Sequence, residues 1–189
     1  MDYPEFISQS SESGWPTCYD YEMQQSLESL YVIKKILDDN PDILRIVELG
    51  TANGGTALFF GACISERGGL VLTVDQTKLM TGGYEGWIEQ AQKLNVSFLY
   101  KDNFTPDAVQ YVKDFIGNNR AMIFCDDGDK KREVALYCKI LKPNDLLLAH
   151  DYENEFFYND LTIELINNYE FYRQNEFPEW HKTLCTRRK

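Results

Sequence analysis

The sequence predicts an α/β fold: a doubly wound, mostly parallel seven-stranded sheet that ends in an antiparallel C-terminal strand pair. Three observations predict it. Five short, almost wholly apolar segments alternate with segments of helical pattern, as buried parallel strands alternate with their crossover helices. Two further strand-like segments follow near the C-terminus without a helix between them. The chain has 189 residues, which suits one domain with a sizeable core over residues 1–189.

Residues 1–40 precede the alternating region, which we expect to form the core over residues 41–189. Residues 1–19 are polar and contain Ser, Gly and Pro, so we expect an extended arm or lid there. The segment 20–39 has the apolar spacing of one helix face, with Asp20 as its N-cap and its end at the Asn-Pro pair that follows. The apolar residues of that face are Met23, Leu27, Leu30, Ile33 and Leu37.

The alternating region then supplies most of the sheet. The expected strands are 43–49, 70–75, 96–100, 120–125 and 145–149. The expected helices between them are 54–66, 84–94, 106–117 and 129–141. A glycine pair at Gly68 ends the first of these helices. Thr105 can cap the third, and Pro106 suits its first position, where the missing N–H costs nothing.

After His150 the pattern changes. Residues 160–169 can form a helix capped by Asp160, whereas 170–175 and 181–187 resemble strands. Because no helix separates these two strands, we expect them to pair antiparallel at the end of the sheet.

Composition excludes several classes of function. The net charge of −11 gives an acidic surface that repels phosphate backbones, so we expect no nucleic-acid partner. No apolar run reaches the length of about 18 residues that a membrane span needs, and the N-terminus lacks the pattern of a signal peptide. We therefore expect a cytoplasmic protein with no membrane partner. The five cysteines form no CxxC pair and no zinc pattern.

A strand, a glycine turn and a helix start meet in the stretch RIVELGTANGGTALFFGA, residues 45–61. Ligands of open α/β sheets bind outside the carboxyl ends of the strands, where a helix start offers backbone N–H groups to an anion. Gly50 and Gly54 would let a ligand approach the backbone closely. The alternative interpretation is a tight structural turn without a ligand.

Asp75 ends the second expected strand, where an acid accepts hydrogen bonds from ribose hydroxyls. Turn and acid together indicate an adenosine cofactor. The dinucleotide pattern GxGxxG would need a glycine where this chain has Ala52. Glu48 disfavours a diphosphate but suits an ammonium group. S-adenosyl-L-methionine carries an ammonium and a carboxylate group and no phosphate, so it fits best.

Four segments in order now carry a family resemblance over residues 45–152: VELGTANGGTAL, VLTVDQ, YKDNFTPDAV and FCDDGDKKREVALYCKILKPNDLLLAHDY. The chain resembles the class I S-adenosylmethionine-dependent methyltransferases, and among them the small-molecule O-methyltransferases of the cephalosporin-hydroxylase-like branch. The resemblance implies a Rossmann-like fold and methyl transfer to a hydroxyl group of a small acceptor such as a sugar, a natural product or a phenol. Lys130 stands where the family commonly has a histidine, and Asn144 and Asp145 replace its usual glycine pair.

The resemblance also implies roles for residues. Glu48, Gly50 and Gly54 would hold the methionine end of the cofactor, Asp75 its ribose and Asp102 the adenine side. The full set implied for cofactor binding is Glu48, Gly50, Thr51, Ala52, Gly54, Thr56, Asp75, Gln76, Asp102, Asn103 and Asp126.

A divalent cation can lower the pKa of an acceptor hydroxyl, and hard cations prefer oxygen ligands. By matching position, the resemblance implies that Asp127, His150 and Asp151 hold Mg²⁺. The alternative is that Asp127 and Asp129 cap the next helix and that His150 binds a backbone group.

Two residues are candidates for the catalytic base. His150 has a suitable intrinsic pKa, and Lys130 matches the position of a lysine in the catechol-type methyltransferases. Lys130 could act as a base only if burial or nearby positive charge lowered its pKa, and the alternative is a solvated lysine on a helix face. Trp87 could lie near the adenine, but we expect it in the core.

Two rival functions remain open at this stage. One is an NAD-dependent oxidoreductase, which Ala52 and Glu48 disfavour. The other is a non-catalytic cofactor-binding or interaction module, which would not need Asp127 or Asp151. The relatives often self-associate, and by analogy the N-terminal arm could exchange between the subunits of a homo-oligomer.

Overall fold

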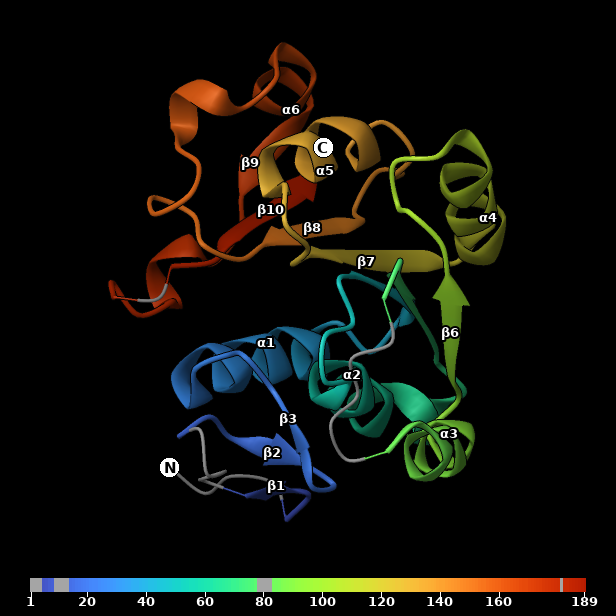
Figure 1. Cartoon of the computed structure of the whole chain (residues 1–189). Coiled ribbons are helices and arrows are strands. Elements are labelled where there is room, and N and C mark those ends of the chain that lie inside the picture. The colour runs from blue at the N-terminus through green and yellow to red at the C-terminus, as the bar shows by residue number, and fades with distance from the viewer. Residues whose placement is uncertain (1–4, 9–13, 78–82, 181) are drawn as a thin grey trace.

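The computed structural model describes residues 5–8, 14–77, 83–180 and 182–189. Seven strands form the main sheet in the order β6-β5-β4-β7-β8-β10-β9 (Figure 1). The first five are parallel, and β10 runs antiparallel to both of its neighbours. Their bounds are β4 Ile43–Leu49, β5 Leu70–Asp75, β6 Val96–Tyr100, β7 Arg120–Cys125, β8 Leu146–Ala149, β9 Tyr169–Phe171 and β10 Leu184–Arg188.

Helices cover both faces of the sheet. The helices are α1 Leu27–Asp39, α2 Gly55–Ile64, α3 Tyr84–Lys93, α4 Pro106–Ile116, α5 Lys130–Tyr137 and α6 Ile163–Asn168. Helices α1, α2 and α3 lie on one face of the sheet, and α4, α5 and α6 lie on the other (Figure 1). One core cluster of buried side chains packs the first group against the sheet, and a second cluster packs the other group. Alternate strand residues enter alternate clusters, as the period of a strand requires: Met122 and Phe124 enter the first, and Ile123 and Cys125 the second.

The doubly wound sheet and its antiparallel C-terminal pair are confirmed. Four of the five expected parallel strands match residue for residue. The fifth begins at Leu146 because Asp145 folds back: its carboxylate accepts hydrogen bonds from the backbone N–H groups of Ala121 (2.8 Å) and Lys142 (2.7 Å). Strands β9 and β10 pair antiparallel, with Arg187 opposite Glu170.

The start of the first helix was predicted wrongly. The helix begins at Leu27, and its N-cap is Ser26, whose side chain accepts a hydrogen bond from Ser29 N at 3.1 Å. Asp20 lies instead in a tight turn at φ +69°, between β2 (Thr17–Cys18) and β3 (Tyr21–Glu22). Met23 matched the helical spacing although it lies before the helix, because a buried residue after a hairpin is apolar too.

The helix near the C-terminus also has a different cap. It begins at Ile163, with Thr162 as N-cap, and Asp160 instead ends the 3-10 helix η2 (Tyr158–Asp160). The Oδ1 atom of Asp160 pairs with Lys131 at 2.6 Å, and its Oδ2 accepts a hydrogen bond from Phe157 N at 3.0 Å. The strand expected at 170–175 is shorter and ends at Phe171.

An extended arm was expected at residues 1–19, whereas the described part of residues 5–22 contains a small three-stranded sheet. Strand β1 (Ile7–Ser8) pairs with β2, and β2 with β3. This sheet lies on α2 of the same chain: Cys18 is fully buried, and the rings of Phe6 and Phe59 lie 6.3 Å apart. Within the described ranges, no helix has the length and apolar character needed to cross a membrane.

Candidate functional site

The glycine turn after β4 is shaped by contacts within the chain. Gly50 has φ +92°, and a Cβ there would lie 2.6 Å from the backbone oxygen of Asp126. Gly54 has φ +83°, and a Cβ there would lie 2.2 Å from Nε1 of Trp87. The Trp87 indole is fully buried and donates a hydrogen bond to the Gly54 carbonyl at 3.0 Å. Trp87 is therefore a core residue. The sequence analysis attributed Gly50 and Gly54 to the close approach of a ligand, but in the structure neighbouring protein atoms leave no space for a side chain at either position.

We expect Gly54→Ala to lower the free energy of unfolding by about 3 kcal/mol, because left-handed strain of about 1–2 kcal/mol adds to the overpacking against Trp87. Gly68→Ala is the matched control, since Gly68 has φ +77° but no atom within 4 Å of an added Cβ. Urea unfolding of both variants measures the difference. Equal losses would show that the Trp87 contact does not restrict position 54.

Asp75, the last residue of β5, holds the same turn. Its Oδ2 accepts hydrogen bonds from the backbone N–H groups of Thr51 (2.9 Å) and Ala52 (3.2 Å). Its Oδ1 accepts from the N–H and the hydroxyl of Thr77, both at 2.7 Å. A carboxylate has about four acceptor positions, so these donors fill them. A ribose diol would therefore bind Asp75 only by displacing some of these donors. The sequence alone did not show that Asp75 already has hydrogen-bond partners.

Glu48 lies beneath this turn. Its side chain is 1% exposed, and its Oε2 accepts a hydrogen bond at 2.5 Å from Thr73, whose hydroxyl also bonds that of Thr51. Burial raises the pKa of Glu48 well above its usual range, the Thr73 hydrogen bond opposes that rise, and the charges of Asp126 and Asp75 add to it. Such a carboxyl gains most from a nearby positive charge.

The other residues assigned to the cofactor lie around the turn in varied settings. Thr56 is buried in the first turn of α2, and Gln76 is exposed directly after β5. Asp102 is exposed and accepts a hydrogen bond from Phe104 N at 2.8 Å. Asn103 is buried. Asp102 can therefore meet a ligand from solvent, whereas Asn103 cannot without a local rearrangement.

Three groups converge at the carboxyl ends of β7 and β8. Asp126, His150 and Asp151 each offer one ligand atom, and these atoms lie within 4.8 Å of one another. Nδ1 of His150 lies 3.0 Å from Asp126 Oδ1 and 3.2 Å from Asp151 Oδ2. We call these three residues the acidic cluster. Two carboxylates are ligands that a divalent cation such as Mg²⁺ prefers, so the donor set fits one.

The acidic cluster contains Asp126 where the sequence suggested Asp127. Asp127 is turned toward Asn103, whose Nδ2 donates to Asp127 Oδ2 at 3.1 Å, and its Oδ1 accepts from Gly128 N at 2.8 Å. Asp129 does cap α5, with its Oδ1 accepting from Arg132 N at 3.0 Å. Of the two neighbouring acids, only Asp126 faces His150.

Lys130 is neither the low-pKa base nor the solvated lysine considered above. It is 9% exposed, and its Nζ lies 3.1 Å from both Asp151 Oδ2 and Glu155 Oε2. Burial alone would lower its pKa, but the charge of Asp126 and the hydrogen bonds to Glu155 and Asp151 outweigh burial and raise it. A lysine with a raised pKa stays protonated at neutral pH, so Lys130 is a poor base.

The two acids of the cluster have opposite tendencies. Burial raises the pKa of Asp126, against the opposing effects of His150 and Lys130. Burial would also raise the pKa of Asp151, but the charge of His150 and the hydrogen bond and charge of Lys130 outweigh burial and lower it. Negative charge is thus unfavourable at Asp126 and partly neutralised at Asp151, so an added cation would be favoured beside Asp126.

Gln25 is a site residue that the sequence analysis missed. It lies between β3 and α1, is fully buried, and donates from Nε2 to Asp126 Oδ2 at 2.8 Å. A glutamine in a polar N-terminal segment gives no sequence signal of this kind. The one feature of the sequence that could have drawn attention to Gln25 is its position just before the first helix.

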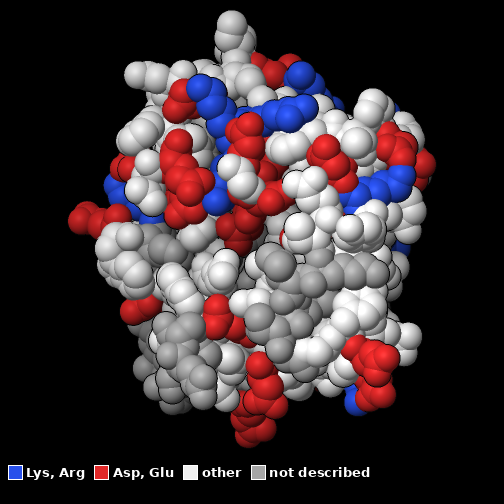
Figure 2. All heavy atoms as spheres, viewed as in Figure 1, with Lys and Arg blue, Asp and Glu red and all other residues white. Residues whose placement is uncertain are grey.

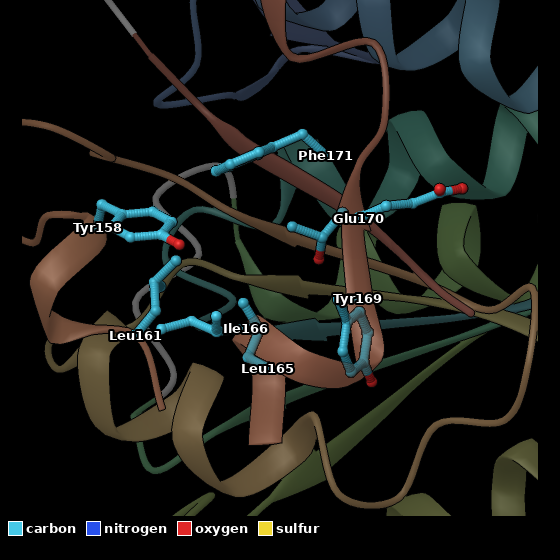
Figure 3. Close-up of a pocket in the computed structure, with 8 residues that line it drawn as sticks. Tyr158, Leu161, Leu165, Ile166, Tyr169, Glu170 and Phe171 are labelled. Atoms are coloured by element: carbon cyan, nitrogen blue, oxygen red, sulfur yellow. The ribbon is translucent and has the colours of Figure 1, made fainter. Parts of the chain in front are cut away.

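A cavity of about 260 Å³ lies next to Asp151. Its lining residues are Asp151, Tyr152, Glu153, Asn154, Glu179, Trp180 and Lys182. A separate cavity of about 170 Å³ lies between η2, α6 and β9, and none of its lining residues was predicted to bind the cofactor, to bind a metal or to act in catalysis (Figure 3). On the face shown in Figure 2, acidic side chains are spread widely, and basic ones lie mainly in the upper half.

No protein-family model matches the chain, and no curated protein matches its sequence. Solved structures do match. A structure of CmcI described as D160 with Mg-SAM has a TM-score of 0.70 and 14% identity over 95% of this chain and 78% of that one. A CmcI structure described as N160 with SAH has a TM-score of 0.63 and 14% identity over 98% and 84%. The O-methyltransferase TomG from Streptomyces achromogenes, in complex with SAM, has a TM-score of 0.53 and 14% identity over 69% and 58%.

At 14% identity these matches show the fold. The chain therefore has the Rossmann-like α/β architecture that the sequence predicted, shared with solved structures that include an O-methyltransferase.

Proposed function

We propose that the chain is an S-adenosyl-L-methionine-dependent methyltransferase that transfers a methyl group to a hydroxyl group of a small molecule. One observation carries this proposal. Glu48, Asp75 and the acidic cluster lie at the carboxyl ends of four adjacent strands, in the sheet order β5-β4-β7-β8. This edge is rich in carboxylates, two of which have raised pKa values. It suits a cofactor that carries both a sulfonium and an ammonium group.

The solved structures support the same proposal. Structures of CmcI have been solved with SAH and with Mg-SAM, and the O-methyltransferase TomG has been solved in complex with SAM. In our proposal the turn and Glu48 hold the methionine end, and Asp75 exchanges its turn donors for the ribose hydroxyls. The exposed Asp102 lies on the adenine side.

Methyl transfer from a sulfonium to an oxygen is a direct displacement, so the site must orient the acceptor and remove its proton. We propose that His150 accepts the proton of the acceptor hydroxyl. Its ring is oriented by Asp126 and Asp151, whose carboxylate oxygens lie 3.0 and 3.2 Å from Nδ1. The carboxylates of Asp126 and Asp151 would hold a divalent cation, which would lower the pKa of an acceptor hydroxyl, and His150 would then act as the base and not as a ligand. The cavity beside Asp151 is polar and is our candidate for the acceptor site.

Calorimetric titration with S-adenosylhomocysteine, with NAD⁺ as the control, tests the cofactor. We expect micromolar binding of the first and no heat from the second. Absence of S-adenosylhomocysteine binding would contradict the proposal, and binding of NAD⁺ alone would favour an oxidoreductase. A screen of hydroxylated acceptors, with and without Mg²⁺, then tests for catalysis. Binding without turnover of any acceptor would favour a non-catalytic module.

A further inference from the structure

Residues 21–25, which directly precede the N-cap of α1, lie outside the strand–helix core and contact the acidic cluster. Residues 21–25 cross the start of α2, where the carbonyl oxygen of Tyr21 would lie 2.3 Å from a Cβ at Gly55. Nδ2 of Asn53 donates to Glu22 Oε1 at 3.2 Å, and Met23 N donates to Pro16 O at 2.8 Å. These contacts fix the segment, and Gln25 is its last residue before the helix cap Ser26.

Gln25 fixes one oxygen of Asp126. Its Nε2 donates to Asp126 Oδ2 at 2.8 Å, while the other oxygen, Oδ1, lies 3.0 Å from His150 Nδ1. The two oxygens are thus held by groups from different parts of the chain, which sets the plane of the carboxylate. Without the amide, Asp126 could rotate and Oδ1 would no longer be directed at His150.

The buried amide of Gln25 lowers the stability of the folded protein, so its presence calls for another reason. Gln25 is fully buried, and among the described residues its Oε1 has no hydrogen-bond partner. A buried acceptor without a partner destabilises the folded state, and an apolar side chain of similar volume would avoid that cost. Nε2 of Gln25 bonds Asp126, and its Oε1 has no partner among the described residues. Both observations indicate that a glutamine stands here to contact Asp126 and not to fill the core.

We propose that Gln25 is a positioning residue that orients Asp126 for cation binding, so that residues 21–25 form part of the active site. The proposal rests on the function proposed above. Groups that orient the ligands of a metal typically change its affinity about 10- to 100-fold when removed. Gln25 would act in this way although it lies outside the strand–helix core that the family resemblance covers.

The test is a titration with Mn²⁺, with the free ion followed by its electron paramagnetic resonance signal. Gln25→Met keeps the volume and removes the N–H donor, and Gln25→Leu is a second variant in case the first does not fold. We expect Mn²⁺ to bind either variant about 10- to 100-fold more weakly than the unmodified chain. The matched control is Gln24→Ala, since Gln24 is its exposed neighbour, and we expect unchanged affinity.

Asp126→Asn should abolish binding and so place the ion in the acidic cluster. Equal Mn²⁺ affinity of Gln25→Met and the unmodified chain would overturn the proposal, as would absence of Mn²⁺ binding by the unmodified chain. A merely structural role would lower the unfolding temperature and leave the Mn²⁺ affinity of the folded protein unchanged. Titration of the same samples with S-adenosylhomocysteine separates the two proposals, because loss of cofactor binding in every sample would contradict the function alone.

Discussion

Asp75→Ala is expected to lower the affinity for S-adenosylhomocysteine by about 100-fold or more. The proposed ribose diol donates two hydrogen bonds to this carboxylate, and each hydrogen bond to a charged group is worth about 1.5–3 kcal/mol. The variant also removes the acceptor for the N–H groups of Thr51 and Ala52, so the turn loses its present anchor. Calorimetric titration measures the loss.

The matched control for Asp75→Ala is Asp114→Ala, which makes the same charge change on the exposed side of α4, where Asp114 accepts a hydrogen bond from Gln110 at 2.8 Å. Its affinity should equal that of the unmodified chain. Asp75→Asn keeps one acceptor oxygen and should fall between the two. An affinity of Asp75→Ala within threefold of the unmodified value would remove Asp75 from the cofactor site.

Glu133→Gln is expected to stabilise the protein at alkaline pH and to have little effect at acidic pH. Glu133 on α5 is fully buried, and its pKa is raised from 4.5 to about 8, first by burial and then by the charge of Asp127. Below about pH 4.5 the residue is protonated in the folded and the unfolded state. As the pH rises to about 8 only the folded state keeps the proton, so the free energy of unfolding falls.

Glutamine removes this fall because it does not titrate. The gain at pH 8.5 should be on the order of 2–4 kcal/mol, since each unit of pKa shift corresponds to about 1.4 kcal/mol. Urea unfolding at pH 5 and pH 8.5 measures it, with Glu89→Gln on the exposed side of α3 as the control. A constant difference between the Glu133→Gln and unmodified proteins across this range would show that Glu133 is ionised in the folded state.

The sheet could be predicted because its strands are apolar runs with clear ends, such as ILRIVEL between Pro41 and Gly50. Helix caps could not be placed as well. Asp20 and Asp160 each lie before an apolar periodic segment, but Ser26 and Thr162 lie closer to the helices and their side chains bond the first-turn N–H groups. Several residues before a helix can match a cap pattern, and only the local backbone path decides among them.

The strand-end positions of the site were also predictable, since a βα unit places such residues at one edge of the sheet. Side-chain direction was not. Asp126 and Asp127 are equivalent in sequence, yet only Asp126 faces His150, because the neighbouring side chain turns toward Asn103. The ion pair of Lys130 with Glu155 and the hydrogen bond of Gln25 with Asp126 join distant segments and leave no local pattern.

The hydrogen bond between Trp87 and the Gly54 carbonyl gives the protein an optical reporter of its own turn. Indole emission responds to changes around the ring N–H, so a ligand that moves this carbonyl would change the fluorescence of a fully buried chromophore. The chain has three tryptophans, and Trp180 is 68% exposed and can be replaced by Phe to reduce background. Cofactor binding could then be followed in a stopped-flow instrument without any added label.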